Sequence, residues 1–465
     1  MRPPLLLLLF LLVAFVTNTT AQSAMPSDDD IRKILIDRID RDHQSVGIVV
    51  GIIEPRVRRI ISYGTLAKDN TRPVDGDTVF EIGSITKVFT SLILADMVQR
   101  REVALTDPIA KYLPPDVRVP ERSGHQITLE DLSTHTSSLP RLPNNMKPAD
   151  PANPYADYSI DQLYQFLSNY TLPRDIGSQF EYSNLGGGLL GHILARRAGM
   201  DYEALVRSRI LVPLKMSDTS ITLTTAMQTR LAAAYDSSLN PAKNWDLPTL
   251  AGAGALRSTA NDMLVFLAAT LGYTDSPLAP AMAAMLKESR PAGPTVGDAK
   301  IEVGLAWMTT TRGNAQIVWH NGGTGGYRSM IAFDPKKRVG IVALSNAGTT
   351  AGVDDIVMHL LDPAVPLMQP PKQHTQITVD QKIYDALVGR YQAAPTFILT
   401  VTREGDHLFV QATGQPRFEI FPEGPREYFL KVVEAQITFD ANVGGHAPGL
   451  TLHQNGRDVA AKRIE

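Results

Sequence analysis

Apolar residues gather in short runs that predict β-strands in two separate parts of the chain. Residues 46–54 (VGIVVGIIE) and 57–64 (VRRIISYG) form the first pair of runs. Residues 317–320, 327–334 and 339–346 form a second group. Runs of this length, rich in β-branched residues and bounded by turn residues, are typical of strands. The turn sequence DPKK between the last two runs predicts an antiparallel hairpin.

Other segments follow the helical period. Residues 28–43 (DDDIRKILIDRIDRDH) are amphipathic and begin with three aspartates, which favour a helix N-terminus. Residues 80–97 (FEIGSITKVFTSLILADM) are apolar on nearly every side, as in a buried helix. Between about 125 and 270 the pattern is mostly helical with many loops. Together with the strands, these helices predict one α+β unit over residues 25–361.

The character of the chain changes after a proline-rich segment. Residues 362–378 carry four prolines and predict a linker. Short strand-like runs separated by turns follow it, among them FILTVTREGDHLFVQATG, RFEIFPEG, EYFLKVV and AQITFDANVGG. This spacing predicts a small all-β domain over residues 379–465, either a sandwich or a barrel.

The first residues of the chain have the composition of a targeting segment. Arg2 precedes an apolar run from Leu5 to Val16, and small polar residues follow. This pattern is typical of a secretory signal peptide, with cleavage after Ala21 or Ala24. A retained membrane anchor is the alternative, but the run is shorter than a bilayer requires. We therefore expect residues 1–21 to be removed, no stable membrane span afterwards, and an exported protein, periplasmic or secreted.

Composition and charge exclude several classes of function. The 465 residues are 43% hydrophobic and 20% charged, as in an ordinary globular protein. A net charge of −3 without a long basic run makes nucleic acid a poor partner. The chain has no cysteine, which excludes disulfides, thiol nucleophiles and thiolate zinc sites. No sequence feature calls for a metal or another cofactor, so the candidate chemistry rests on oxygen and nitrogen groups.

The first candidate pair lies at the start of the apolar segment 80–97. Ser84 and Lys87 are three residues apart, so on a helix their side chains can touch. A helix N-terminus favours negative charge on the serine oxygen. A lysine in an apolar setting is more easily neutral and can accept a proton. The alternative is a solvent-facing lysine, which the apolar surroundings disfavour; S-x-x-K alone occurs about twice by chance in a chain of this length.

A second candidate pair lies in the stretch SQFEYSNLGGGLLGH. Tyr182 and Asn184 are separated by one residue and stand beside glycines that permit close backbone approach. A tyrosine near a lysine can ionise more easily and act as a base, while an asparagine amide can bind a carbonyl or amide of a substrate. Taken alone, Tyr182 is better explained as an ordinary loop tyrosine.

The third candidate group lies in the stretch IVWHNGGTGGYRS. An apolar strand runs into His320, and Gly322 and Gly323 follow. Glycines allow a substrate to lie against a strand edge and a backbone N–H to face an oxyanion. His320 can donate a hydrogen bond or carry positive charge at mildly acidic pH. A hairpin with turn glycines is the alternative.

Two further patterns invite over-interpretation. Gly186, Gly188 and Gly191 match the G-x-G-x-x-G fingerprint of dinucleotide sites, but no buried strand precedes them, so we expect no such cofactor. The remaining histidines do not have ligand spacing, and we expect structural or solvated roles for His125, His135, His192 and His359. No G-x-S-x-G elbow occurs, which argues against an α/β-hydrolase.

The three candidate groups occur in one order that resembles a known family. Ser84-x-x-Lys87, Tyr182-x-Asn184 and His320-x-Gly322 are similar to the motifs of the penicillin-recognising serine hydrolases. The resemblance extends over about residues 30–360 and is nearest to the class C β-lactamase, DD-peptidase, esterase and AmpH-like carboxypeptidase branch. It includes the stretches LTDPIAKYLP, ITLEDLSTHTSSLPR, FEYSNLGGGLLG and AGAGALRSTANDM. The C-terminal segment resembles the lipocalin-like module appended to some of these enzymes.

The resemblance implies an antiparallel sheet flanked by helices, with a helical subdomain beside it and the active site between them. Ser84 would be acylated, and Lys87 and Tyr182 would share the general base and acid roles. Tyr182 would activate the deacylating water, and Asn184 would bind the amide of the substrate. The backbone N–H groups of Ser84 and Gly323 would form the oxyanion hole.

The chain departs from the family pattern at the third motif. Many β-lactamases have lysine where this chain has His320 and threonine where it has Asn321, and that lysine attracts a substrate carboxylate. Arg328 can supply the missing charge, although a surface arginine on a strand is an equal alternative. Ile176 replaces a more usual proline.

These features leave three functional hypotheses for one set of residues. The first is hydrolysis of β-lactams or D-Ala-D-Ala-type peptides through an acyl-enzyme at Ser84. The second is a carboxylesterase that uses Ser84, Lys87 and Tyr182 on small esters. The third is a penicillin-binding protein that is acylated but turns over slowly. In each case the expected partner is a small-molecule or peptide substrate.

Overall fold

A computed structural model describes residues 25–464 except 288, 294–298, 370–373, 395–396, 414, 416, 432–434, 442–444 and 455–456. The chain forms two compact units, of which the first ends at Met368 and the second begins at Gln369. This boundary falls inside the segment 362–378 that the sequence predicts as a linker. The predicted signal peptide, residues 1–21, lies outside the described residues, as do residues 370–373 of the linker.

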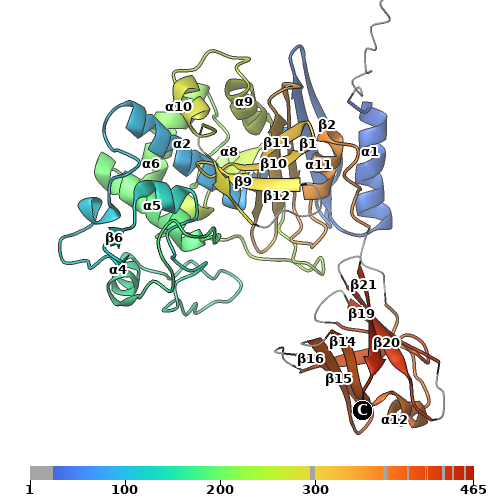
Figure 1. Ribbon diagram of the computed structural model, residues 1–465. Coiled ribbons are helices and arrows are strands. Elements are labelled where there is room, and N and C mark those ends of the chain that lie inside the picture. Colours follow the sequence, from blue (N-terminus) through green and yellow to red (C-terminus); the bar gives the residue numbers. More distant parts are fainter. Residues whose placement is uncertain are drawn as a thin grey trace, which may run out of the picture. The chain divides into compact units, whose positions relative to one another are not determined.

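An antiparallel sheet is the centre of the first unit (Figure 1). Within the described residues it has nine strands, and it includes all five strands that the sequence predicts. In spatial order the strands are β3 (Asn70–Pro73), β2 (Val57–Ala67), β1 (Gly47–Glu54), β13 (Val339–Ser345), β12 (Arg328–Asp334), β11 (Ala315–Gly323), β10 (Met308–Arg312), β9 (Ala299–Val303) and β8 (Arg290–Pro291).

The sheet joins the two ends of the first unit. β1 pairs with β2 on one side and with β13 on the other, where Ile48 faces Ser345 and Ile52 faces Ile341. β12 lies between β13 and β11, so the predicted hairpin of β12 and β13 is confirmed. This pairing places the glycine-rich C-terminal end of β11 beside the start of β12, and the candidate residues meet at this end of the strands.

Each face of the sheet has its own core, because successive side chains of a strand point to opposite faces. On one face Ile48, Val50 and Ile52 pack with α1 (Asp28–Ile36) and α11 (Asp354–Leu361). The other face packs against the larger core, which includes the central helix α2 (Thr86–Gln99) and α9 (Ala260–Thr270). The amphipathic helix predicted near the N-terminus is therefore confirmed and covers the sheet.

The remaining helices of the first unit form a subdomain on the α2 side. They are α3 (Leu129–Ser133), α4 (Ile160–Asn169), α5 (Asn184–Ala198), α6 (Tyr202–Val206), α7 (Val212–Leu214), α8 (Thr225–Gln228) and α10 (Ala279–Ala284). Short helical turns cover Asp37–Arg41, Ile109–Tyr112, Arg207–Leu211 and Ala251–Ala253, and β5 (Glu121–Arg122) pairs with β6 (His125–Gln126). This arrangement confirms an α+β fold.

Most of the segment 80–97 is helical, as the sequence predicts, but its first residues belong to a strand and a turn. Phe80 and Glu81 belong to β4 (Val79–Glu81), which pairs with β7 (Arg257–Thr259). Gly83 then has a φ of +48°, and a 3₁₀ turn over Gly83–Ile85 leads into α2. A left-handed glycine ends the strand sharply, because residues with a Cβ rarely adopt that conformation. Ser84 therefore lies in a tight turn at the N-terminal end of α2.

The second unit is a closed antiparallel barrel. Eight strands close it among the described residues: β14 (Gly389–Ala394), β15 (Phe397–Glu404), β16 (His407–Ala412), β17 (Arg417–Pro422), β18 (Glu427–Phe429), β19 (Ala435–Phe439), β20 (Gly449–Gln454) and β21 (Arg457–Arg463). The turn Gln381–Ile383 and α12 (Tyr384–Leu387) precede them, and Tyr391, Tyr428 and Phe439 lie in the core. Of the two predicted all-β architectures, the barrel is the correct one. No helix in the described part of the chain is long and apolar enough to cross a membrane.

Candidate active site

Ser84 and Lys87 are in direct contact, as their spacing predicts. The Nζ atom of Lys87 lies 3.0 Å from Oγ of Ser84, 2.9 Å from Oδ1 of Asn184 and 2.7 Å from the carbonyl oxygen of Ala253. These acceptors come from the turn before α2, the first residue of α5 and the turn Ala251–Ala253. Three segments far apart in the sequence therefore meet at one amino group.

The environment of Lys87 favours its neutral form. The side chain is 2% exposed. Burial lowers the pKa of Lys87 well below its ordinary value, and the charge of Arg141 lowers it further. A neutral amine can donate to Asn184 and to the Ala253 carbonyl while its lone pair faces the hydroxyl of Ser84. The geometry therefore suits transfer of the Ser84 proton to Lys87.

Close backbone approach makes room for the lysine. A Cβ on Gly187 would lie 2.9 Å from Cε of Lys87, closer than real side-chain contacts allow. Gly187 lies in the first turns of α5, so the helix can pack its backbone directly on the lysine stem. The glycines after Asn184 thus serve packing, and this includes the three that match the dinucleotide fingerprint. Gly186, Gly188 and Gly191 all lie inside α5 and not in a phosphate-binding loop.

Tyr182 lies beside the Ser84–Lys87 pair. Nζ of Lys87 is 4.9 Å from the centre of its ring, and Ser84 is a hydrogen-bonding partner of its hydroxyl. Burial raises the pKa of Tyr182 to about 12, although the hydrogen bond with Ser84 opposes the change. The expectation that Tyr182 ionises more easily beside a lysine is not met, because burial outweighs its neighbours. In the resting site the phenol is neutral and can donate a proton.

Asn184 is fixed on both ends of its amide. Its Oδ1 accepts from Lys87, and its Nδ2 donates to the hydroxyl of Tyr155 at 3.0 Å. Tyr155 is 5% exposed and packs on Trp245, with ring centres 5.4 Å apart. Asn184 therefore helps to hold the amino group of Lys87 in place, in addition to its predicted contact with substrate. Tyr155 belongs to none of the sequence motifs, and its hydrogen bond with Asn184 is visible only in the folded structure.

His320 does not have the role that its position suggested. It lies inside β11, which continues past the predicted end at His320 to Gly323. It is 2% exposed, and its Nδ1 bonds to the carbonyl oxygen of Asn321 at 2.6 Å. Burial lowers the pKa of His320 to about 3, and the nearby charge of Lys87 lowers it too. His320 therefore stays neutral at mildly acidic pH, and the prediction that it carries positive charge there is wrong. Its ring centre lies 6.3 Å from that of Tyr182, so it packs behind the site.

Gly322 and Gly323 bring the end of β11 against the turn that holds Ser84. A Cβ on Gly83 would lie 2.7 Å from the backbone nitrogen of Gly323, and a Cβ on Gly322 would collide with the carbonyl oxygen of Ile82. Ser329 on the next strand donates to the same Ile82 carbonyl at 2.9 Å. The backbones of these two segments are therefore in contact, as an oxyanion hole formed by Ser84 and Gly323 requires.

Arg328 is a half-buried cation at the start of β12, next to the glycine-rich end of β11. Its Nε donates to the carbonyl of Thr349 and its Nη2 to that of Gly348, both at 3.1 Å. Its Nη1 lies so close to Gly323 that a Cβ there would collide with it. Burial lowers the pKa of Arg328, and the charge of Asp354 opposes this change. The structure thus places a fixed positive charge beside the predicted oxyanion strand.

A cavity of about 760 Å³ joins these groups. Ser84, Tyr182 and Asn184 line it together with Arg328 and the end of β11. An apolar wall faces them, made of Leu142, Met146, Pro154, Tyr155, Trp245 and Met368. The exposed Arg141 adds a second positive charge, and its guanidinium carbon lies 5.2 Å from the centre of the Tyr182 ring. Sequence patterns gave no role to Arg141 or to the apolar wall.

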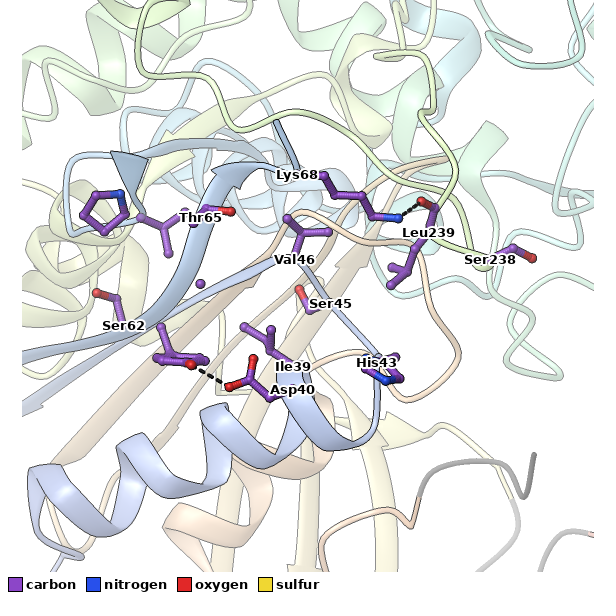
Figure 2. Close-up of a pocket in the computed structure, with 14 residues that line it drawn as sticks. Ile39, Asp40, His43, Ser45, Val46, Ser62, Thr65, Lys68, Ser238 and Leu239 are labelled. Carbon is purple, nitrogen blue, oxygen red and sulfur yellow. Dashed lines mark hydrogen bonds between the residues drawn. The ribbon is translucent and has the colours of Figure 1, made fainter. Parts of the chain in front are cut away.

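A second cavity of about the same volume differs in its chemistry. It lies between the turn Asp37–Arg41, β2 and a loop near Leu239 (Figure 2). Its polar groups bond within the protein: Tyr63 donates to Asp40 at 2.6 Å, and Lys68 donates to the Leu239 carbonyl. None of the predicted site residues lines it. Size therefore does not distinguish the two cavities, whereas the Ser84–Lys87 contact does.

Of the four histidines that the sequence predicts to be structural or solvated, three have local contacts and His125 is exposed. His192 Nε2 lies 2.7 Å from the hydroxyl of Tyr164, and His359 Nδ1 lies 2.7 Å from the carbonyl oxygen of Val365. His125 lies in β6. His135 follows α3 but is buried beside Tyr182, with ring centres 4.5 Å apart.

Known proteins match the sequence over most of the first unit. Residues 32–361 match the family described as Beta-lactamase, and residues 373–463 match a domain of unknown function (DUF3471). The D-alanyl-D-alanine-carboxypeptidase/endopeptidase AmpH of Escherichia coli (strain K12) is 32% identical over 367 residues, which cover 74% of this chain and 93% of the relative. Penicillin-binding protein 4* of Bacillus subtilis (strain 168) is 24% identical over 457 residues, 93% of this chain and 98% of the relative.

Solved structures show the same fold. A β-lactamase/D-alanine carboxypeptidase from Yersinia pestis in complex with citrate matches 73% of this chain and 97% of its own, with 26% identity and a TM-score of 0.61. A class C β-lactamase from Rhodobacter sphaeroides matches 72% of this chain and 99% of its own, with 25% identity and a TM-score of 0.61. The family match covers more than half of the chain and includes every candidate residue. The chain therefore belongs to the beta-lactamase family.

Proposed function

We propose that Ser84 is the nucleophile of this serine hydrolase and that Lys87 is the base that activates it. The observation that carries the proposal is the buried contact of Lys87 Nζ with Ser84 Oγ at 3.0 Å. A nucleophilic serine needs a neighbouring base within hydrogen-bond reach, and burial supplies one by favouring the neutral amine.

The geometry supports acyl transfer in two steps. Ser84 Oγ attacks the carbonyl carbon while its proton passes to Lys87, and the backbone N–H groups of Ser84 and Gly323 stabilise the oxyanion. When the tetrahedral intermediate collapses, the bond to the leaving group breaks and the acyl group stays on Ser84. Water then attacks the ester carbonyl and gives one proton to the base. The base passes this proton to Ser84 Oγ as the C–Oγ bond breaks, which releases the acid and restores the free serine.

Tyr182 fits the role of proton donor to the leaving group. Its phenol is neutral because burial raises its pKa to about 12. A neutral phenol can protonate the leaving nitrogen and then recover a proton from the Lys87 ammonium. In the second step the same pair takes the proton of the attacking water, so Tyr182 shares the duty that the sequence assigns to it.

The charges of the cavity and the relatives support a proposal for the substrate class. Arg328 and Arg141 place two positive charges around an acyl site that also has an apolar wall and the carboxyl group of Asp354. We propose a β-lactam or a D-Ala-D-Ala-type peptide, whose carboxylate would pair with Arg328 in place of the neutral His320. The relative AmpH carries carboxypeptidase and endopeptidase activity in its name, and the Yersinia pestis protein carries β-lactamase and carboxypeptidase activity.

The remaining sequence predictions belong to this proposal. Residues 1–21 would direct export to the periplasm or the exterior, where cell-wall peptides and β-lactams are met. The bounds 25–361 for the hydrolase, 362–378 for the linker and 379–465 for the barrel domain complete it. The relative Penicillin-binding protein 4* matches along both units, which supports the proposed order of domains along the chain.

A specific observation supports a carboxylesterase as the second candidate. The residue that would attract a substrate carboxylate is the buried, neutral His320. If Arg328 does not replace its charge, neutral esters become the better substrates. A penicillin-binding protein with slow turnover would use the same Ser84 but hold the acyl group.

One substrate panel separates these functions. The purified mature chain is given a chromogenic cephalosporin, a D-Ala-D-Ala peptide and a p-nitrophenyl ester, and intact mass spectrometry follows a penicillin adduct. Turnover of the cephalosporin or the peptide supports the β-lactamase or carboxypeptidase function, and turnover of the ester alone supports the carboxylesterase. A lasting penicillin adduct supports a penicillin-binding protein with slow turnover. The matched variant Ser84→Ala should lose every activity and the adduct, and wild-type rates in this variant would refute the proposal.

A further inference from the structure

His135 lies directly behind the catalytic tyrosine and is 3% exposed. Its ring centre is 4.5 Å from that of Tyr182, at an angle of 34°. On another side of His135, the ring of Phe180 lies edge-on at 5.7 Å. The imidazole therefore occupies a fixed place between two aromatic rings of the segment that carries the phenol.

The backbone around Tyr182 is bound to His135 on both sides. The N–H of Glu181 donates to the carbonyl oxygen of His135 at 2.8 Å, and the N–H of Ser183 donates to its Nδ1 at 3.1 Å. One residue thus accepts from the positions immediately before and after the tyrosine. These two bonds and the ring contact restrict both the backbone and the ring plane of Tyr182.

The bond from Ser183 also fixes the state of the imidazole. Nδ1 must keep its lone pair to accept that bond, so the proton of the neutral ring is on Nε2. Nε2 is buried without a hydrogen-bond partner among the described residues. A buried donor left in this way is costly, and a histidine that served stability alone would normally use both nitrogens.

The loop after His135 extends the same support to Asn184. The carbonyl of Pro140 accepts from Oγ of Ser183 at 2.6 Å, and the carbonyl of Arg141 accepts from the N–H of Asn184 at 3.0 Å. His135 itself has a φ of +57°, a conformation that turns the chain sharply after α3. The loop 135–141 is thus a template on which the Tyr182–Asn184 segment lies.

We infer that His135 is a positioning residue for the proton transfers of Tyr182, through its Nδ1 and its ring. It does not exchange protons itself, since the template needs the neutral imidazole. This inference rests on the proposed function of Tyr182 but adds a residue outside the three motifs. Removing the ring should leave the Ser84–Lys87 contact in place and misdirect the phenol.

The test is a double-mutant cycle with His135→Asn and Tyr182→Phe. Asparagine keeps a side-chain acceptor and tolerates a left-handed conformation, while the ring is lost. With wild-type Tyr182, His135→Asn should lower kcat about 10- to 100-fold and change KM little, since a small misplacement near the chemistry has effects of this size. In the Tyr182→Phe background the same substitution should have almost no further effect, because the hydroxyl that it positions is gone.

Controls separate positioning from stability. His192 Nε2 lies 2.7 Å from the hydroxyl of Tyr164, and neither residue lines the cavity that contains Ser84. His192→Asn should lower Tm while kcat stays at the wild-type value. If His135→Asn is not folded by circular dichroism, His135→Gln takes its place in the cycle.

Two outcomes would overturn the inference. One is an equal loss of kcat in both backgrounds, which would show that His135 acts independently of Tyr182. The other is a lower Tm with unchanged kcat, which would make His135 a structural residue. Both differ from failure of the proposed function, which would instead appear as wild-type rates in the Ser84→Ala variant.

Discussion

Nζ of Lys87 lies 3.0 Å from Oγ of Ser84 inside a site that excludes water from the lysine. The two residues are bound to each other before any substrate enters. Because burial lowers the pKa of the lysine, its charge state is the property on which activity depends. The predictions begin with that property.

Replacement of Lys87 by methionine should remove the base and keep most of the packing. We expect kcat/KM to fall about 10²- to 10⁴-fold, the usual contribution of a general base. Lys87→Arg should lower kcat/KM by a similar factor, since a guanidinium stays charged and cannot accept the serine proton. Because the neutral lysine is the active form, wild-type activity should decline as the pH falls through the lowered pKa. Rates measured from pH 5 to 8 check this, and an active Lys87→Arg enzyme would contradict it.

A methyl group on Gly187 should displace the side-chain carbons of Lys87. The new Cβ would lie 2.9 Å from Cε of the lysine, so the amine must shift. We expect Gly187→Ala to lower kcat about 100-fold, as for misplacement of about 1 Å. Gly186→Ala in the same helix meets only Ser183 at 3.3 Å and is the matched control. Equal kcat values for the two variants would argue against the packing role of Gly187.

Arg328 should distinguish anionic from neutral substrates. If its guanidinium binds a carboxylate, Arg328→Gln removes a charge-assisted bond and raises KM for a penicillin or peptide about tenfold or more. The KM for a neutral p-nitrophenyl ester should change little, since that substrate has no carboxylate. Steady-state kinetics on both substrates check this. An equal effect on both would assign Arg328 a purely structural role.

His320 should make the protein sensitive to acid without acting as a charge switch. Its folded pKa of about 3 lies below the ordinary value of 6.5, so the unfolded chain binds the proton more readily. The contribution to stability is therefore full above pH 6.5 and is lost as the pH falls toward 3. Urea unfolding at pH 7 and pH 4.5 should show a smaller difference for His320→Gln than for the wild type. A rise in affinity for anionic substrates between pH 7 and 5 that depends on His320 would contradict its neutrality.

The sequence predicts the local elements of the sheet but not their neighbours. The runs 46–54 and 339–346 are both recognisable as strands, yet the pairing of Ile48 with Ser345 joins positions far apart in the chain. Nothing in a local pattern encodes such a pairing. The same limit applies to the start of α2, where tertiary pairing with β7 makes Phe80 and Glu81 part of a strand.

The candidate site shows where pattern is sufficient and where it fails. The order of motifs led to Ser84, Lys87, Tyr182 and Asn184, and the fold brings all four together. His320 was misjudged because the sequence reveals that it lies on a strand but not that it is buried. His135, Tyr155 and Arg141 were missed as site residues because each acts through a contact between segments that have no common motif. The carbonyl of Ala253 has no side-chain signature at all.

The three hydrogen-bonding partners of Lys87 have a consequence for the reactivity of the chain before it is fully folded. Ser84, Asn184 and Ala253 reach the amine only when α2, α5 and the turn Ala251–Ala253 are docked together. In the unfolded chain the lysine is solvated and stays an ammonium, so Ser84 lacks a base to activate it. Reactivity is thus withheld until assembly is complete, and an immature molecule is protected from acylation by the very compounds that the mature enzyme would attack.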